Sequence, residues 1–125
     1  MNPNFVYKIA LPDVPLNGDP NQPIDRTAID EDIGFIHLAS AEQVPAIVQQ
    51  KFHYFREISI LKIDYSRIEE ATQWELSRSN APDQTLYPHY YGDLKVGFVR
   101  DVLTGRKGAQ GDFQSLLDEF VSWSS

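Results

Sequence analysis

The 125-residue chain, with 42% hydrophobic and 23% charged residues, has the length and balance of one globular domain. We therefore expect a single domain over residues 1–125, with no separate cofactor domain. Its 18 acidic and 11 basic residues give a formal net charge of −7, which repels phosphate backbones and anionic lipids and so disfavours nucleic acids and membranes as partners. The absence of cysteine excludes disulfides, thiolate metal sites and a cysteine nucleophile.

Residues 1–4 are neither basic nor followed by a long apolar run, so we expect no signal peptide. No apolar run approaches the roughly 20 residues that a membrane-spanning helix needs. We therefore expect an acidic protein of the cytoplasm. Nothing in the sequence indicates its oligomeric state.

Runs of branched and aromatic residues, bounded by turn-forming residues, predict five strands along the chain. The expected strands are residues 5–11, 34–38, 58–63, 72–76 and 94–103. A helical turn is expected at residues 66–71, between the third strand and the fourth. Strands and helices do not alternate regularly, which disfavours parallel β-α-β winding. The pattern therefore predicts an α+β protein whose strands are mostly antiparallel, with two main helices.

The two helices are predicted from capping residues and helical periodicity. The first covers residues 40–55, where Ser40 and Gln43 match a capping box and Pro45 can delay the start by a few residues. The second follows Asp112, which is a favourable N-cap residue. Its apolar residues recur at helical spacing and are Phe113, Leu116, Leu117, Phe120 and Val121. This stripe predicts a helix face that is buried in the core.

Three segments rich in turn residues are predicted as loops. Residues 12–22 follow the first strand, and both a plain surface loop and a lid over a ligand are compatible with that place. Residues 78–87 form the second loop. Residues 105–111, GRKGAQG, are glycine-rich and basic, but they lack the spacing and the Lys-Ser/Thr ending of a phosphate-binding loop. We interpret them as a solvated loop.

Three polar insertions into apolar sequence are the candidates for chemistry. His37 interrupts the second strand, and a buried imidazole must find hydrogen-bond partners. Glu75 follows Trp74, and an aromatic neighbour can raise the pKa of a carboxyl group or help it to position a sugar hydroxyl. Residues 88–92, PHYYG, place a histidine beside two phenols whose flat faces suit a stacked ligand. Each insertion also has a plain structural interpretation, as a satisfied histidine, a surface carboxylate or a buried aromatic ring.

In combination, these motifs resemble domain-of-unknown-function family 952, a family of small bacterial proteins. The resemblance rests on YKI at residues 7–9, DIGFIHLASAEQV at residues 32–44, the strand at residues 60–64, WE at residues 74–75 and PHYYGDL at residues 88–94. It covers residues 5–103. The resemblance implies a remote relation to the ADP-ribosyltransferase-like superfamily. Its fold has a split antiparallel β core that carries helices on its outside.

The superfamily binds NAD, and the resemblance implies roles for particular residues. A histidine segment on a strand hydrogen-bonds a ribose, and His37 and Ser40 match that segment. An aromatic residue stacks on nicotinamide, a role open to Tyr90 or Tyr91. A late glutamate orients the reacting ribose, and Glu75 is the motif carboxylate of this chain, although it precedes the tyrosines whereas the superfamily usually has its glutamate after the aromatic residue.

Two classes of function stay open on the sequence alone. The first is a NAD- or nucleotide-binding pocket, with an ADP-ribosyl (glycosyl) transferase as the candidate enzyme. Its predicted catalytic residues are Glu75 and His37, and its predicted ligand-binding residues are Ser40, Trp74, Arg78, His89, Tyr90 and Tyr91. The second is a non-enzymatic ligand-binding or interaction domain in which these residues form a structural polar network. A metal site is disfavoured because no two histidines are closely spaced.

Overall fold

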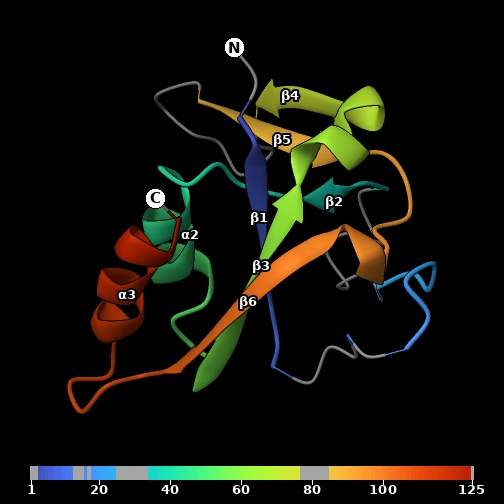
Figure 1. The fold of residues 1–125 in the computed structure, drawn as a ribbon. Helices are drawn as coiled ribbons and strands as arrows, with labels where there is room; N and C mark the ends of the chain where they lie inside the picture. The colour runs from blue at the N-terminus through green and yellow to red at the C-terminus, as the bar shows by residue number, and fades with distance from the viewer. Residues whose placement is uncertain (1–2, 13–15, 17, 25–33, 77–84, 125) are drawn as a thin grey trace.

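The computed structural model of the chain describes residues 3–12, 16, 18–24, 34–76 and 85–124. The strands in this part form two antiparallel three-stranded sheets (Figure 1). The first sheet has the order β1-β3-β6, with β1 at Phe5–Ala10, β3 at Glu57–Asp64 and β6 at Val99–Arg106. The second has the order β2-β5-β4, with β2 at Ile36–His37, β5 at Leu86–Tyr90 and β4 at Thr72–Leu76.

Two α-helices accompany the sheets, α2 at Val44–Lys51 and α3 at Gln114–Ser124. Short 3-10 turns lie at Tyr65–Arg67 (η1), Glu69–Ala71 (η2) and Val96–Phe98 (η3). The first two occupy the place of the helical turn predicted at residues 66–71. The predicted α+β class, with antiparallel strands and two helices, is confirmed for the residues that the structure describes.

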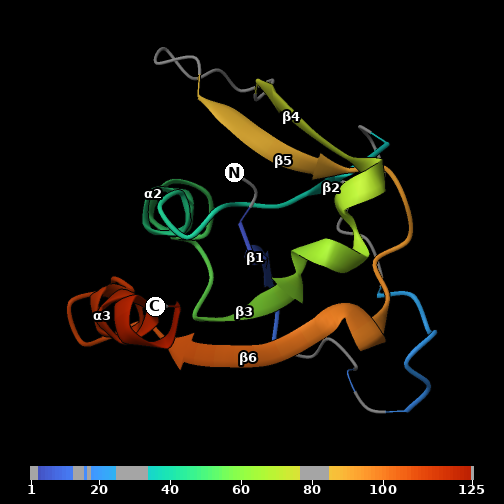
Figure 2. The same cartoon turned by 45° about the horizontal axis from the view of Figure 1, so that its top comes forward.

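The β1-β3-β6 sheet forms the middle layer of the molecule. In Figure 2, α2 and α3 lie to the left of this sheet, and β4 and β5 lie above it. The cluster of buried residues toward the helices includes Tyr7, Ile58, Ile60, Val44, Val48, Leu116, Leu117 and Phe120. The cluster toward the second sheet includes Val6, Leu61, Ile63, Ile36, Tyr90 and Leu94. Because both of its faces are covered, β3 is buried at consecutive positions, from Ile58 to Leu61, rather than at alternate ones.

The two sheets are fastened together where β1 meets the chain that follows β2. The backbone N–H of Tyr7 donates to the carbonyl oxygen of Ala39 at 2.8 Å, and the N–H of Ala39 donates to the carbonyl oxygen of Tyr7 at 2.9 Å. These two bonds make an isolated antiparallel bridge. As a result, the strand that carries His37 is held against the central layer.

The helix predicted at residues 40–55 is shorter than predicted and runs only over Val44–Lys51. Pro45 lies at the first helical positions, where a proline is tolerated because no intrahelical N–H is needed there. The side chain of Gln43 accepts the backbone N–H of Ser40 at 2.9 Å, which is the returning half of the predicted capping box. The capping residues therefore shape the turn before α2 rather than its first turn.

The prediction of a strand over residues 94–103 is wrong at both ends, because β6 runs over Val99–Arg106. Within the predicted strand, residues Val96–Phe98 form η3 instead. The backbone N–H of Val96 donates to the carbonyl oxygen of Gln22, and that of Gly97 donates to the carbonyl oxygen of Pro20. These tertiary bonds compete with strand pairing. At the other end, β6 continues into the segment that was predicted as a glycine-rich loop.

Two further predictions need correction. Val121 is 65% exposed, so it does not belong to the buried face of α3, whereas the other four apolar residues of the predicted stripe are buried. The second predicted loop ends early because β5 begins at Leu86. Residues 78–84 of that loop, and residues 13–15 and 17 of the first loop, lie outside the described residues.

Candidate functional site

One face of the second sheet carries four of the predicted site residues, which are His37, Glu75, His89 and Tyr91. His37 of β2 is paired directly with His89 of β5, and Glu75 of β4 lies two residues from the partner of His89 on that strand. Side chains alternate between the faces of a strand, so these three side chains point the same way. Phe35 and Tyr91, two residues from His37 and His89 respectively, extend the same face.

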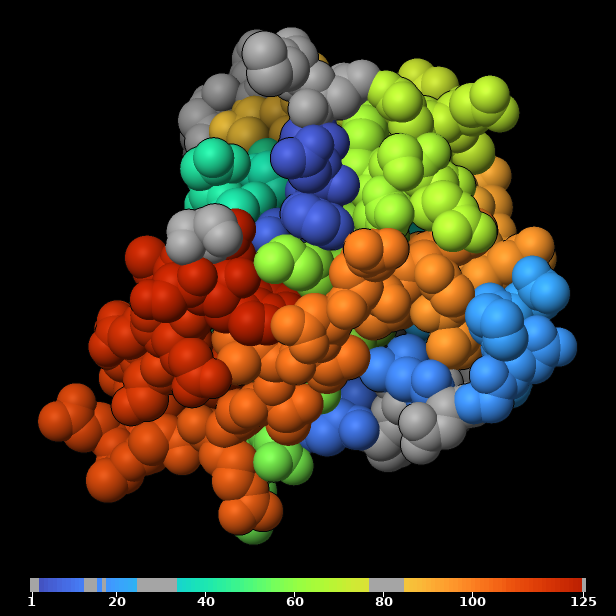
Figure 3. Space-filling model, in the orientation of Figure 1, coloured from blue at the N-terminus to red at the C-terminus, as the bar shows by residue number. Residues whose placement is uncertain are grey.

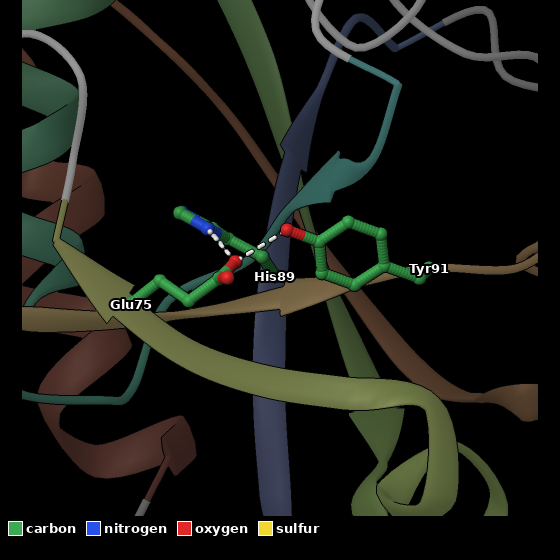
Figure 4. A network of polar contacts seen from close by, with 3 residues as sticks. All are labelled: Glu75, His89 and Tyr91. Carbon is green, nitrogen blue, oxygen red and sulfur yellow. Dashed lines mark hydrogen bonds and ion pairs between the residues drawn. The ribbon is translucent and has the colours of Figure 1, made fainter.

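A carboxylate on this face accepts two hydrogen bonds through one oxygen (Figure 4). Oε1 of Glu75 lies 3.0 Å from Nδ1 of His89 and 2.5 Å from the hydroxyl of Tyr91, which donates to it. The His89 side chain is 3% exposed, whereas the Glu75 side chain is 42% exposed. We call these residues the Glu75–His89–Tyr91 network. It connects a buried imidazole with a carboxylate that solvent reaches.

Phe35 packs against three rings of this face, those of His37, His89 and Tyr91. Its ring is stacked on His89, with centroids 4.1 Å apart and an interplanar angle of 22°. Its centroid also lies 4.9 Å from that of His37 and 5.2 Å from that of Tyr91. The two imidazoles are edge-on to one another at 5.4 Å. Because Phe35 is buried, it keeps water from one face of His89 and fixes the plane of that ring.

The surroundings shift the pKa values of all three network residues. Burial lowers the pKa of His89 below its ordinary 6.5, the neighbouring His37 lowers it further, and the hydrogen bond to Glu75 opposes both. The hydrogen bond from Tyr91 and then that from His89 lower the pKa of Glu75. The bond to Glu75 raises the pKa of the Tyr91 phenol. At neutral pH the network therefore consists of a neutral imidazole, a carboxylate and a protonated phenol.

The tautomer of His89 follows from these ionisation states. A carboxylate only accepts hydrogen bonds, so the proton of the neutral ring is on Nδ1 and the lone pair is on Nε2. A carboxylate that orients an imidazole in this way is a common element of general acid–base sites. Glu75 and Tyr91, which are both partly exposed, present an acceptor and a phenol to the outside. The arrangement can hold a ligand that carries hydroxyl groups.

Two of the predicted ligand-binding residues lie on the opposite face of this sheet, where Tyr90 is buried in the core and Trp74 is partly buried against it. Tyr90 is 8% exposed, and its ring lies so close to Gly92 that a Cβ added there would be 2.8 Å from the ring atom Cζ. Trp74 donates its Nε1–H to the hydroxyl of Tyr65 at 2.9 Å. The structure thus separates these two aromatic side chains from the Glu75–His89–Tyr91 network.

The remaining predicted site residues are Ser40 and Arg78. Ser40 lies in the turn before α2, where its backbone N–H is bonded to Gln43. Arg78 lies outside the described residues. The ligand-binding roles of both residues stay predictions.

Phe35 lies on this face and is not among the residues that the sequence predicts for the site. The available signal was its place two residues before His37, because residues i and i+2 of a strand share a face. Its aromatic character then predicts contact with whatever lies above that face.

Within the part of the chain that the structure describes, no group of three or more His, Asp or Glu side chains lies close enough to hold a metal ion. Among the same residues, no helix has both the length and the apolar character required to cross a membrane.

The chain matches the sequence model of a protein family. Residues 18–102 match the model described as "Protein of unknown function (DUF952)". The match spans more than half of the chain. The chain belongs to the DUF952 family. The matched range includes the residues of this DUF952 protein that lie on the candidate face, from Phe35 to Tyr91.

Solved structures similar to this DUF952 protein include the protein CC0527 from Caulobacter crescentus. The X-ray structure of CC0527 is 24% identical, with a TM-score of 0.74 over 91% of this chain and 98% of that one, and a double mutant of CC0527 gives the same values. The solution NMR structure is 23% identical, with a TM-score of 0.67 over 87% and 90% of the two chains. At this level of identity the likeness shows the fold. A comparison with curated proteins gives no match.

Proposed function

We propose that the Glu75–His89–Tyr91 network, together with Phe35 and His37, binds the ribose of NAD or of a related nucleotide. The observation that carries the proposal is one carboxylate oxygen held by a buried imidazole and by an exposed phenol. Binding sites for small molecules combine aromatic walls with a few convergent polar groups that are fixed in advance. The network is fixed in this way, and its carboxylate is open to a ligand.

A remote relation to the ADP-ribosyltransferase-like superfamily supports the choice of ligand. The motifs GFIHL, WE and PHYYG resemble those of a family placed there, and two antiparallel sheets with helices outside them agree with a split β core. In that superfamily a strand histidine and a glutamate contact the riboses of NAD. His37 and Glu75 are the residues of this chain that match those roles.

The candidate reaction is transfer or hydrolytic release of an ADP-ribosyl group. Breaking the bond between ribose and nicotinamide builds positive charge on the ribose, and a nearby carboxylate stabilises that charge. Glu75 is the group for this step, because its pKa is lowered and it is ionised at neutral pH. His89 and Tyr91 position the carboxylate, and His37 contacts the same ribose.

A second function is favoured by one specific observation, the burial of His89. Its imidazole is nearly inaccessible, is stacked on Phe35 and is bonded to Glu75. A polar network that is satisfied internally can serve to fix the packing of a sheet. On this alternative the protein is a non-enzymatic ligand-binding or interaction domain, and the network stabilises the second sheet.

Titration of the isotope-labelled protein with NAD and with ADP-ribose, followed by NMR and calorimetry, tests the proposal. We expect the signals of Phe35, His89 and Tyr91 to shift together. We expect Glu75→Gln to weaken binding about tenfold, the size of one lost charge-assisted hydrogen bond. The matched control is Glu70→Gln, which neutralises an exposed carboxylate of η2.

The two functions differ in the result. Absence of binding at millimolar ligand, together with lower stability of the Glu75→Gln variant, supports the structural alternative and refutes the nucleotide site. Binding without release of nicotinamide identifies a binding domain. Release of nicotinamide that is lost in Glu75→Gln identifies an enzyme.

A further inference from the structure

Two arginine side chains and one lysine side chain gather at one end of this acidic molecule. Arg56 precedes β3, Arg106 is the last residue of β6, and Lys107 follows it. Together they line a hollow of about 280 Å³. We call this feature the basic groove. A second hollow, of about 230 Å³, adjoins it because Lys107 lines both.

Backbone pairing holds the basic groove in place. Arg106 is paired with Glu57 in the β3–β6 ladder, and the N–H of Lys107 donates to the carbonyl oxygen of Arg56 at 2.9 Å. The three cations therefore come from the last rungs of one sheet. Such a frame fixes the backbone positions that carry the charged side chains better than a free loop does.

Lys107 lines both hollows, and its side chain makes two contacts there. Its Nζ donates to the carbonyl oxygen of His53 and lies 6.0 Å from the centre of the Phe113 ring. An ammonium group has three N–H donors, so this bond leaves donors for a ligand. Lys107 therefore presents its charge at a defined point of the groove.

Two carboxylates lie near the basic groove and set its net charge. Glu57 contacts Arg106, with Oε2 3.4 Å from Nε, but the Arg106 side chain is 79% exposed and such surface pairs are weak. Asp112 lines the adjoining hollow, and its Oδ1 accepts the backbone N–H of Gln114 at 3.2 Å. Residues 102–111 contain two cations and no acid. The groove therefore stays positive on a chain whose net charge is −7.

We propose that the basic groove binds the phosphate group of a small phosphorylated ligand. Two guanidinium groups provide planar, forked sets of donors that match phosphate oxygens, and a lysine adds a point charge. Like charges in one hollow repel one another, and a dianion removes that repulsion. The hollow has the volume of a small ligand and is open to solvent through exposed side chains.

The basic groove is separate from the Glu75–His89–Tyr91 network. In Figures 1 and 2 the C-terminal end of β6 and the β4–β5 pair lie at opposite ends of the molecule. Figure 3 shows the segment that follows β6 standing out from the lower left of the surface. The proposal therefore adds a second site, and it holds or fails independently of the proposed nucleotide site.

Titration with inorganic diphosphate tests the proposal, with sodium chloride at matched ionic strength as the reference. We expect the side-chain N–H signals of Arg56 and Arg106 to shift and saturate with diphosphate. We expect Arg56→Gln and Arg106→Gln each to weaken binding about tenfold, which is one lost charge-assisted contact. The matched control is Arg100→Gln, because Arg100 lies on the same strand and also pairs weakly with a carboxylate, that of Asp64 at 4.0 Å.

The outcomes separate specific binding from general attraction. Saturable shifts that are confined to the basic groove and weakened only by the Arg56 and Arg106 substitutions support the proposal. Equal shifts with chloride, or an equal loss of affinity in Arg100→Gln, overturn it. Binding of a single-stranded oligonucleotide without binding of diphosphate also overturns it, because the groove would then serve a nucleic acid rather than a small ligand.

Discussion

Replacement of Gly105 by alanine tests the packing of α3 on β6. Gly105 is paired with Ile58 in the β3–β6 ladder, and its backbone is not in the left-handed region, so alanine meets no strain in the main chain. The added methyl group would lie 2.7 Å from Cδ1, 3.0 Å from Cβ and 3.1 Å from Cγ of Leu116. The perturbation is therefore steric and is directed at one buried side chain.

The expected magnitude follows from these three distances. Carbon atoms in contact are normally about 3.5–4.0 Å apart, so α3 must move away from the sheet or Leu116 must change its rotamer. Overpacking of this kind costs about 1–3 kcal/mol. Reduced freedom of the unfolded chain recovers about 0.4–1 kcal/mol. We expect Gly105→Ala to lower the free energy of unfolding by about 1–2 kcal/mol.

Urea unfolding followed by far-UV circular dichroism measures this change. The matched control is Gly108→Ala, because a Cβ at Gly108 would meet only the carbonyl oxygen of Asp112, at an ordinary 3.9 Å. We expect the control to leave the stability unchanged or slightly higher. Equal stabilities of the Gly105 and Gly108 variants would refute the close packing of Leu116 on β6.

The other predictions concern the second sheet. Glu75→Gln replaces the carboxylate that accepts the Tyr91 hydroxyl, and that hydrogen bond is the largest cause of the raised pKa of Tyr91, so the phenol is expected to titrate at lower pH. An unchanged ultraviolet titration would contradict the bond between them. Burial lowers the pKa of His89, so below about pH 6.5 this histidine binds a proton more readily in the unfolded chain than in the native protein. The free energy of unfolding should therefore fall as the pH drops below about 6.5. His89→Gln should flatten that slope, and a slope equal to the parent's would exclude His89 as its source. Trp74→Phe deletes the hydrogen bond to Tyr65 and should cost about 1 kcal/mol in urea unfolding. A fully stable Trp74→Phe variant would show that this bond contributes nothing.

The apolar stripe of α3 shows how much of the burial pattern of a helix can be predicted from helical periodicity. Four residues of the predicted stripe are buried, because they lie within a narrow arc of the helix surface. Val121 comes eight residues after Phe113, which places it about 80° further round the helix at 3.6 residues per turn. Whether a residue at this border of the apolar stripe is buried depends on which elements pack beside the helix. Helical periodicity gives no information about those elements.

The strand that carries His89 is harder to predict, because Pro88 lies in its middle. Proline has no N–H for a sheet ladder, so a sequence pattern with an internal proline argues against a strand. In the structure Pro88 contributes its carbonyl oxygen instead, which accepts the N–H of Leu38 at 3.0 Å. Pairing with β2 and β4 on both sides keeps this segment extended.

The candidate site could be predicted as a set of residues but not as an arrangement. The motifs contain Glu75, His89, Tyr90 and Tyr91, yet only the register of β5 decides which of the two adjacent phenols meets the carboxylate. One residue of difference turns a side chain from the site into the core. The contact between Glu75 and His89 joins two strands, and no rule of local spacing contains it.

The pair of backbone hydrogen bonds between Tyr7 and Ala39 has a consequence for how the protein unfolds. A sheet joined to its neighbour only by side chains can open alone, but here a backbone bridge joins β1 of the first sheet to Ala39, two residues after β2 of the second. Opening the strand next to His37 must therefore break bonds of β1, which lies in the main core. We expect the amides of Tyr7 and Ala39 to exchange with solvent hydrogen at one common, slow rate, as members of one cooperative unit. A ligand on the second sheet would then stabilise the whole described fold rather than one half of it.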